Sequence, residues 1–477
     1  MSSPLFLHAF FLCLLFSVPA VASVDSLILT RDERDLVLKT SAESTHGHRI
    51  PGMFTEDGVQ WAHLILPEKA PFLILPSHFI AAPSFQANFT SIPKNAYGNK
   101  MLGTALGDIL LGGSGDQILD GLAGADLLQG GSGSDTYLFT LGSGADVIEE
   151  QGADSDKIFL GKAVTWHTIR PAVEDGDVHL SFVGSPYDHL RIKNGALGRK
   201  TVETVSFFDG HAFALKDVQK KGDNIRFMFA EGGVGKIVHP DKTAAFHVQG
   251  TEFADLLVAG GGQDILDGKA GADALYAGAG DDLLRIDVED VFFDGGAGHD
   301  RVEIAAPDGL TLALASHNVE AVIGAEGADI LDASSVKAPI HLEGKGGDDR
   351  LITGVRGGVL LGGLGDDHYV VGKESGYVTF QEEGDGADKI IINAPVALSD
   401  VQIVRKEEDL YVFISQSSAI CIKGQYAPGQ KDGQIEAVVF SGPEGESRDL
   451  TNLLSIPTVL PPEADLSLFP LLPTGDN

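Results

Sequence analysis

A repeat of nine residues runs through the middle of the chain, from Gly250 to Glu303. Read in nines, the segment is GTEFADLLV, AGGGQDILD, GKAGADALY, AGAGDDLLR, IDVEDVFFD and GGAGHDRVE. The eighth residue is apolar in every nine, small residues crowd the first four positions, and the sixth is Asp except at Val291. A fixed period of this kind predicts a repetitive architecture rather than a Gly/Asp-rich linker.

The spacing predicts a parallel coil in which two nines make one turn. The glycine-rich half of each nine suits a tight turn, and the half around the apolar residue suits a strand of about three residues. One apolar side chain per nine reaches a shared interior only if the chain coils and stacks. The sixth positions then recur on one edge at every second nine. The expected stacked pairs are Asp255 with Asp273, Asp264 with Asp282, and Asp282 with Asp300.

A first block of the same pattern covers residues 103–138, as GTALGDILL, GGSGDQILD, GLAGADLLQ and GGSGSDTYL. Its sixth residues are Asp108, Gln117, Asp126 and Asp135. We expect Asp108 over Asp126 to be a good pair. Gln117 over Asp135 is expected to be weaker, because a carboxamide offers only a neutral oxygen.

A later block continues the central one after a lapse in register. LTLALASHNVEAVIG predicts a strand pair in the lapse. The nines are then GAEGADILD, GKGGDDRLI, TGVRGGVLL and GGLGDDHYV, with Asp329, Asp349, Gly358 and Asp367 at the sixth position. The last three keep register, so Asp349 is expected over Asp367. Asp329 stands outside that register, and we expect no partner for it.

Stacked carboxylates repel one another unless a cation lies between them. Carboxylates and turn carbonyls are hard oxygen donors, which suit Ca²⁺ because this ion accepts 6–8 oxygens in flexible geometry. The candidate metal ligands are therefore the sixth-position aspartates: Asp108, Asp126, Asp135, Asp255, Asp264, Asp273, Asp282, Asp300, Asp329, Asp349 and Asp367.

The nines resemble the RTX, or haemolysin-type, calcium-binding repeat GGxGxDxUx. This resemblance covers roughly residues 103–450. It implies an all-β fold, with parallel β-roll blocks (a right-handed β-helix) in tandem and several bound Ca²⁺ ions, about five or more. Residues 139–218 and 371–450 parallel each other and resemble the haemolysin-type calcium-binding-related segment. Their alternating apolar residues predict antiparallel strands that cap each coil.

The rest of the chain sets the domain organisation. Residues 1–22, MSSPLFLHAFFLCLLFSVPAVA, carry no Asp, Glu, Lys or Arg and end in Ala-Val-Ala, as a cleaved secretory signal peptide does. We expect a small N-terminal β unit of unknown role at 23–100. The first roll with its cap follows at 103–218, then a connector at 219–249 and the second roll with its cap at 250–450. The proline-rich tail at 451–477 is expected to be irregular.

The amino-acid composition narrows the classes of molecule that the protein could bind. The 477 residues carry a formal net charge of −34, which argues against nucleic acid and against anionic membranes. Outside the N-terminal run, no segment is apolar and long enough for stable membrane insertion. With the signal removed, Cys421 is the one cysteine, so no intramolecular disulfide is expected.

The first functional hypothesis is a non-catalytic, secreted, extracellular protein whose rolls fold on binding Ca²⁺. It would serve adhesion, matrix or surface interaction, with extracellular glycans or a cell surface as candidate partners. The alternative is a calcium-stabilised secreted hydrolase or polysaccharide-modifying enzyme. Neither a His-Glu-x-x-His helix nor a Gly-x-Ser-x-Gly elbow occurs, so no catalytic residue is assigned. A pore-forming toxin is the third hypothesis, disfavoured because no long apolar or amphipathic helical segment precedes the repeats.

Overall fold

The computed structural model describes two compact units, Met1–Glu231 and Gly232–Asn477. Side chains are described for residues 99–150, 154–197, 202–222, 224–238, 243–314, 317–381, 386–394, 396, 400–427, 434–440 and 464–470. Of strands β1–β8 and β44, the backbone alone is described. The expected signal peptide at 1–22 lies outside the described residues.

Two facing sheets form the coil of the first unit. One has the order β16-β17-β18-β14-β12-β10-β6-β7 and the other the order β20-β19-β15-β13-β11-β9. The strands of the first are β16 (Ile169–Glu174), β17 (Asp177–Phe182), β18 (Ser185–Ile192), β14 (Ala145–Ile148), β12 (Leu127–Gln129), β10 (Asp108–Leu111), β6 (His63–Ile65) and β7 (Phe72–Leu73). Those of the second are β20 (Ala212–Ala214), β19 (Thr204–Phe207), β15 (Lys157–Leu160), β13 (Thr136–Phe139), β11 (Ile118–Leu122) and β9 (Lys100–Thr104).

Smaller elements complete this unit. An antiparallel sheet joins β3 (His48–Ile50), β2 (Asp35–Lys39), β1 (Ser26–Asp32) and β8 (Ser84–Asn88). Two hairpins pair β4 (Phe54–Thr55) with β5 (Gly58–Val59), and β21 (Gln219–Lys221) with β22 (Asn224–Met228). Short 3₁₀ helices are η3 (Trp166–Thr168), η4 (Gly195–Leu197) and η5 (Leu215–Asp217).

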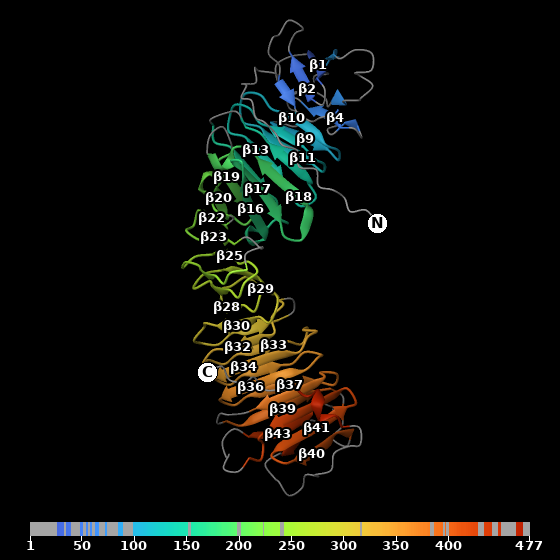
Figure 1. The fold of residues 1–477 in the computed structure, drawn as a ribbon, viewed down its shortest axis with the longest axis vertical. Coiled ribbons are helices and arrows are strands. Elements are labelled where there is room, and N and C mark those ends of the chain that lie inside the picture. The colour runs from blue at the N-terminus through green and yellow to red at the C-terminus, as the bar shows by residue number, and fades with distance from the viewer. Residues whose placement is uncertain are drawn as a thin grey trace. The chain divides into compact units, whose positions relative to one another are not determined.

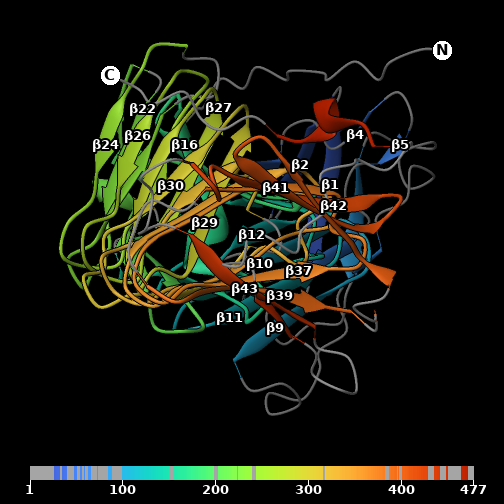
Figure 2. The same cartoon turned by 90° about the horizontal axis from the view of Figure 1, so that it is seen from below.

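Parallel strands also build the second unit (Figure 1). One side begins with β23 (Val234–Ile237), β25 (Leu256–Val258), β27 (Ala274–Ala279) and β29 (Phe292–Ala297). That side then carries a sheet of β31 (Thr311–Ala313), β33 (Ile330–Asp332), β35 (Arg350–Ile352), β37 (His368–Gly372), β39 (Asp388–Asn393), β43 (Ile435–Phe440) and β44 (Ser447–Asp449). Figure 2 shows β37, β39 and β43 side by side at the capped end of this sheet.

The opposite side of the second unit is a single eleven-stranded sheet. In order, its strands are β24 (His247–Gln249), β26 (Ile265–Asp267), β28 (Leu283–Ile286), β30 (Arg301–Ile304), β32 (Ala321–Ile323), β34 (Ile340–Gly346), β36 (Gly358–Leu364), β38 (Tyr377–Gln381), β42 (Ser418–Lys423), β41 (Asp409–Ser415) and β40 (Gln402–Lys406).

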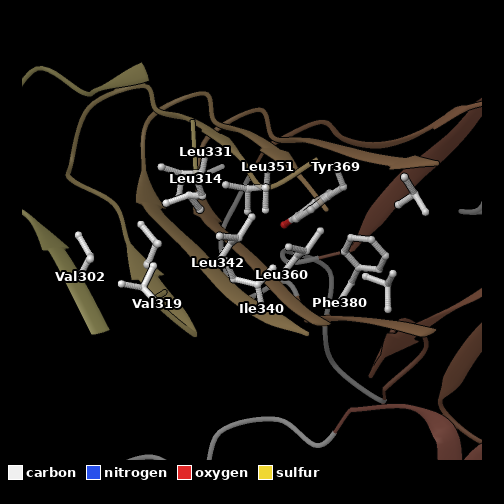
Figure 3. Close-up of a cluster of buried hydrophobic side chains, with 14 of the residues drawn as sticks. Val302, Leu314, Val319, Leu331, Ile340, Leu342, Leu351, Leu360, Tyr369 and Phe380 are labelled. Carbon is white, nitrogen blue, oxygen red and sulfur yellow. The ribbon is translucent and has the colours of Figure 1, made fainter. Parts of the chain in front are cut away.

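The interior is lined by the apolar residue at the eighth position of each nine. In Figure 3, Leu331, Leu351 and Tyr369 from one sheet face Leu360 and Phe380 from the other. All five are fully buried and belong to one continuous core cluster. Fully burying such a side chain contributes about 1.5–3 kcal/mol, so each turn adds its own increment of core. The periodic apolar residue therefore fixes where each strand must lie.

The predicted all-β fold with parallel coil blocks is confirmed. The capping segments follow the prediction in part, because β16–β17–β18 and β40–β41–β42 are antiparallel. However, β14, β15, β18 and β19 pair in parallel with the coil, so residues 139–218 first extend the stack. The predicted strand pair in the register lapse is wrong. Strands β31 and β32 do form there, but they lie in opposite sheets.

A C-terminal segment lies against the outer face of the second cap. Residues 464–470 include the 3₁₀ helix η8 (Leu466–Leu468), and Phe469 packs edge-on against Tyr377 and Tyr411. The Thr379 hydroxyl donates a 2.8 Å hydrogen bond to the carbonyl of Pro470. Cys421, which is free and fully buried, belongs to the same small cluster.

Candidate metal centre

Every predicted ligand lies where a turn meets a strand, and all are buried. The exposed fraction is at most 3% for the whole set: Asp108, Asp126, Asp135, Asp255, Asp264, Asp273, Asp282, Asp300, Asp329, Asp349 and Asp367. Turn and strand together place each carboxylate at the corner of the coil.

The structure brings together all the expected pairs. In each pair, the backbone N–H of the earlier residue donates to Oδ1 of the Asp one full turn later. The distances are 2.8 Å from Asp255 to Asp273, 2.7 Å from Asp264 to Asp282 and 2.9 Å from Asp282 to Asp300. They are 2.8 Å from Asp349 to Asp367 and 2.7 Å both from Asp108 to Asp126 and from Gln117 to Asp135. The stacked acids are therefore linked through one oxygen by a backbone donor.

The second carboxylate oxygen divides ten of the eleven ligands into two groups. In Asp108, Asp255, Asp264 and Asp329, Oδ2 accepts an N–H from the second residue of the same nine. In six others, Oδ2 is buried and has no hydrogen-bond partner among the described residues: Asp126, Asp135, Asp273, Asp282, Asp300 and Asp349. A buried carboxylate oxygen without a donor is costly, which marks these six as positions that need a cation.

Glycine at the first position makes room for that oxygen. A Cβ on Gly268 would collide with the carboxylate of Asp273, and one on Gly344 with that of Asp349. The same contact recurs between Gly121 and Asp126. At these three positions the glycine is required by the acid five residues later, whereas Ala259 and Ala277 take the first position before Asp264 and Asp282.

Burial makes these carboxyls hard to ionise without a cation. It is the largest cause that raises the pKa of Asp126, Asp273 and Asp349 to about 8 and that of Asp135 to about 7. Neighbouring carboxylates add to the effect; Asp290 does so at Asp273. A divalent cation at the corner would reverse this balance by favouring the charged form.

The donor chemistry of these corners fits a hard cation. In the part of the chain with described side chains, no three His, Cys, Asp or Glu residues converge as a metal-binding cluster. A cation here would therefore combine carboxylate oxygens of Asp residues with carbonyl oxygens of the glycine-rich turns. Such an all-oxygen shell suits Ca²⁺.

The expectation that Asp329 has no partner is wrong. Its N–H donates to Asp349 Oδ1 at 2.7 Å, and Leu310 N–H donates to its own Oδ1 at 2.6 Å. Asp329 and Asp349 are 20 residues apart rather than 18. The corners absorb the two extra residues, and the strands keep their alignment.

Several acids of the same kind lie outside the nine-residue frame. In the nine whose sixth residue is Val291, the preceding residue Asp290 supplies the carboxylate. It accepts the N–H of Asp273 at 3.1 Å. Beyond the nines, the ladder continues through Asp146, Asp156, Glu203, Glu320, Asp388 and Glu436. For Asp146, Asp156 and Asp388 a signal exists, since each is followed two residues later by Val or Ile, as in the nines. The glutamates carry the same mark, with Val two residues later, but have Glu where the nines have Asp.

Gln117 is a different kind of corner. Its carboxamide oxygen accepts the N–H of Gly113 at 3.2 Å, and its amide nitrogen donates to the Ser114 carbonyl at 3.3 Å. The side chain thus satisfies its own turn. The neighbouring Asp116 accepts the N–H of Ser134 through Oδ1 at 2.8 Å.

Comparison with known families identifies the repeats. A family model described as "RTX calcium-binding nonapeptide repeat (4 copies)" matches residues 102–137, 111–148 and 249–284. No curated protein matches the chain. Among solved structures, the extracellular lipase LipA from Serratia marcescens is similar at 15% identity and a TM-score of 0.10. That match covers 69% of this chain and 38% of the lipase chain.

Within the described residues, no helix is long and apolar enough to cross a membrane. The features that remain are the stacked corners, the glycines beneath them and the buried acids. Together with the family match, these features show that the chain carries RTX calcium-binding nonapeptide repeats, folded as a parallel β-roll.

Proposed function

We propose that this is a secreted calcium-binding protein whose coils fold when Ca²⁺ reaches them outside the cell. The observation that carries the proposal is the set of six buried carboxylate oxygens without a donor. A chain with net charge −34 repels itself until cations neutralise it. Low intracellular Ca²⁺ would keep the chain loose, and about millimolar Ca²⁺ outside would fill sites of the affinity typical of extracellular modules.

The expected energy is sufficient for a switch. A ligand that binds only the folded state at tenfold saturation stabilises it by about 1.4 kcal/mol per independent site. About five such sites would supply about 7 kcal/mol, which is comparable to the whole stability of a domain. Folding of the coils is therefore expected to depend on Ca²⁺.

A Ca²⁺ titration of the purified chain tests this proposal. Circular dichroism should show a cooperative gain of β signal, and calorimetry should count about five or more ions, with little response to Mg²⁺. A chain that is already fully folded in chelator would contradict the proposal, because packing alone would then hold the coils. Amino-terminal sequencing of exported protein would test cleavage after Ala22.

For the biological role, we propose adhesion, matrix or surface attachment. A long stack of similar turns offers a repetitive outer face, which suits binding to an extended partner. Screens for proteolysis, lipolysis and glycan cleavage in the presence of Ca²⁺ would contradict a purely adhesive role if any gave turnover. Leakage from liposomes would point to a pore-forming toxin instead.

A further inference from the structure

The nine-residue turns that carry Asp or Gln at the sixth position have two conformations. The second residue of the nine distinguishes them. In seven turns this residue is left-handed, with φ between 67° and 107°: Leu122, Gly131, Lys269, Gly278, Gly296, Lys345 and Gly363. In the other five turns it is not left-handed: Thr104, Gly113, Thr251, Gly260 and Ala325. One repeated sequence pattern thus folds into two kinds of turn.

The place of a turn in its ladder decides which kind it is. A ladder is a row in which a backbone N–H donates to the acid one turn later, and the described residues contain five such rows. The five turns without a left-handed second residue each begin a ladder, and they carry Asp108, Gln117, Asp255, Asp264 and Asp329. The seven left-handed turns all come later. We call the two kinds starter turns and follow-on turns.

The acid of a starter turn is hydrogen-bonded by the protein through both oxygens. At Asp329, Oδ2 accepts the N–H of Ala325 at 2.7 Å and Oδ1 accepts that of Leu310 at 2.6 Å. Asp264 is held in the same way, from its own turn and from outside its ladder. Each N–H points its positive end at an oxygen, so these buried carboxylates are stabilised without a cation.

Gln117 shows that a starter turn forms without any charge. Its Oε1 accepts the N–H of Gly113, which is the hydrogen bond that the second residue makes in every starter turn. A neutral carboxamide thus takes the place of the carboxylate. The first position of a ladder therefore does not require an acid, as a site for a hard cation would.

Six of the follow-on turns lack this hydrogen bond, and three of them hold a strained residue. All six acids whose Oδ2 is buried without a donor belong to follow-on turns. The left-handed region is unfavourable for residues with a Cβ, yet Leu122, Lys269 and Lys345 adopt it at φ of 67°, 75° and 76°. Such strain persists where the surroundings compensate it, and it is common at ligand sites. The strained residue and the open oxygen therefore identify the same turns.

We propose that Ca²⁺ binds only at follow-on turns, and that the starter turn is a metal-free end on which the first ion site of each ladder is built. The proposal rests on the calcium-dependent folding given above and specifies which turns take the ion. It removes four candidate ligands from the set: Asp108, Asp255, Asp264 and Asp329. Hydrogen bonds alone form a starter turn, whereas a follow-on turn needs an ion to offset its open oxygen and its strain.

Two neighbouring acids of one ladder give a matched test. Asp329 lies in a starter turn and Asp349 in the next follow-on turn, and both are buried. Native mass spectrometry of the full chain in excess Ca²⁺ counts the bound ions, and circular dichroism checks that each variant folds. Asp349→Asn should lose one ion relative to wild type, whereas Asp329→Asn should keep the wild-type count. Any other pair of counts would overturn the proposal.

Gln117→Glu tests the same claim by adding a charge to a starter turn, so it does not depend on how Asp329→Asn folds. The new carboxylate can still accept the N–H of Gly113. No extra ion should bind to this variant. One ion more than in wild type would contradict the metal-free starter turn.

The left-handed residue is tested at Leu122, which is 44% exposed. Leu122→Gly should lower the Ca²⁺ concentration at half-maximal folding, because glycine adopts this conformation without strain. Leu122→Val should raise it, because a β-branched residue is an outlier there. Ala325→Gly, at the same position in a starter turn, should not lower it. Equal shifts in Leu122→Gly and Ala325→Gly would overturn the link between the left-handed residue and the ion.

These outcomes are distinct from those that test calcium-dependent folding itself. A wild type that is already folded in chelator refutes that folding switch. A wild type that folds with Ca²⁺ but loses an ion in Asp329→Asn refutes the starter turn alone.

Discussion

At the scale of the residue, each sixth-position aspartate uses its two oxygens differently. Oδ1 accepts a backbone N–H from the preceding turn, as Asp273 does from Asp255. Oδ2 either accepts an N–H within its own turn, as in Asp264, or is buried without a donor, as in Asp273. The first oxygen holds the stack together, and the second creates the demand for a cation.

Removing the charge of one Asp whose Oδ2 has no hydrogen-bond donor should therefore weaken calcium binding but preserve the stack of turns. In Asp273→Asn, the carboxamide oxygen can still accept the N–H of Asp255. We expect one ion fewer by calorimetry and a loss of about 1.4 kcal/mol of calcium-dependent stability. Asp267→Asn removes the same charge from the outer side of β26 and serves as the control. An unchanged calcium midpoint and ion count in Asp273→Asn would remove this corner from the site.

The glycine beneath the Asp349 carboxylate, Gly344, gives a second residue-scale prediction. In Gly344→Ala, the new methyl group would occupy the place of the Asp349 carboxylate. We expect a cost of about 1–3 kcal/mol in urea unfolding, as for an overpacked core. Gly346→Ala in the same strand is the control, because its nearest neighbour is the flexible side-chain end of Glu326 at 3.3 Å. Equal effects of the two changes would show that crowding of the carboxylate is not the cause.

At the scale of the element, the sequence predicted the regular parts of the coil and failed at its irregular corners. A constant period reveals strands such as β25 to β28, because the same spacing recurs. Asp329 was misjudged because corners tolerate turns of 20 residues without disturbing the stack. Glu203 and Glu436 were missed because each has Glu where the nines have Asp and contacts an acid 47 or 48 residues earlier. The Val two residues after each glutamate marks the position, but no local pattern can report a contact over that distance.

The docked C-terminal segment gives a prediction for an element. Phe469 packs on Tyr377 and Tyr411, and Cys421 is fully buried in the same cluster. Burial also raises the pKa of the Cys421 thiol to about 11, so it should be unreactive in the native state. In Phe469→Ala, we expect a thiol reagent to label Cys421 at least tenfold faster, with β content retained. Leu364→Ala, at a residue 57% exposed and outside this cluster, should label as slowly as wild type.

At the scale of the whole molecule, low pH and bound Ca²⁺ should each stabilise the folded state, because either a proton or a cation can neutralise the buried carboxylates. Burial raises the pKa of Asp126, Asp273 and Asp349 from 3.8 to about 8. Such a carboxyl binds its proton more tightly in the folded state. The stability that it contributes is complete below its unfolded value of 3.8 and is lost as pH rises through about 8.

Metal-free protein should therefore be more folded at about pH 5 than at about pH 8.5, with a larger β signal and, where a transition is seen, a higher melting temperature. Saturating Ca²⁺ should remove or reverse this order, because the ion binds the charged carboxylates and competes with protons. Thermal melts followed by circular dichroism under the four conditions measure both effects. A metal-free protein that gains stability with rising pH would contradict the buried-acid account.

The ladder of N–H groups and carboxylates also gives each coil a direction, like a filament with unlike ends. Each acid completes the turn that precedes it, and the last acceptor belongs to a cap: Glu203 in the first unit and Glu436 in the second. A ribosome delivers the chain from the opposite end. Its growing edge therefore always exposes an unfinished turn, and each coil is sealed only when its closing glutamate has been made.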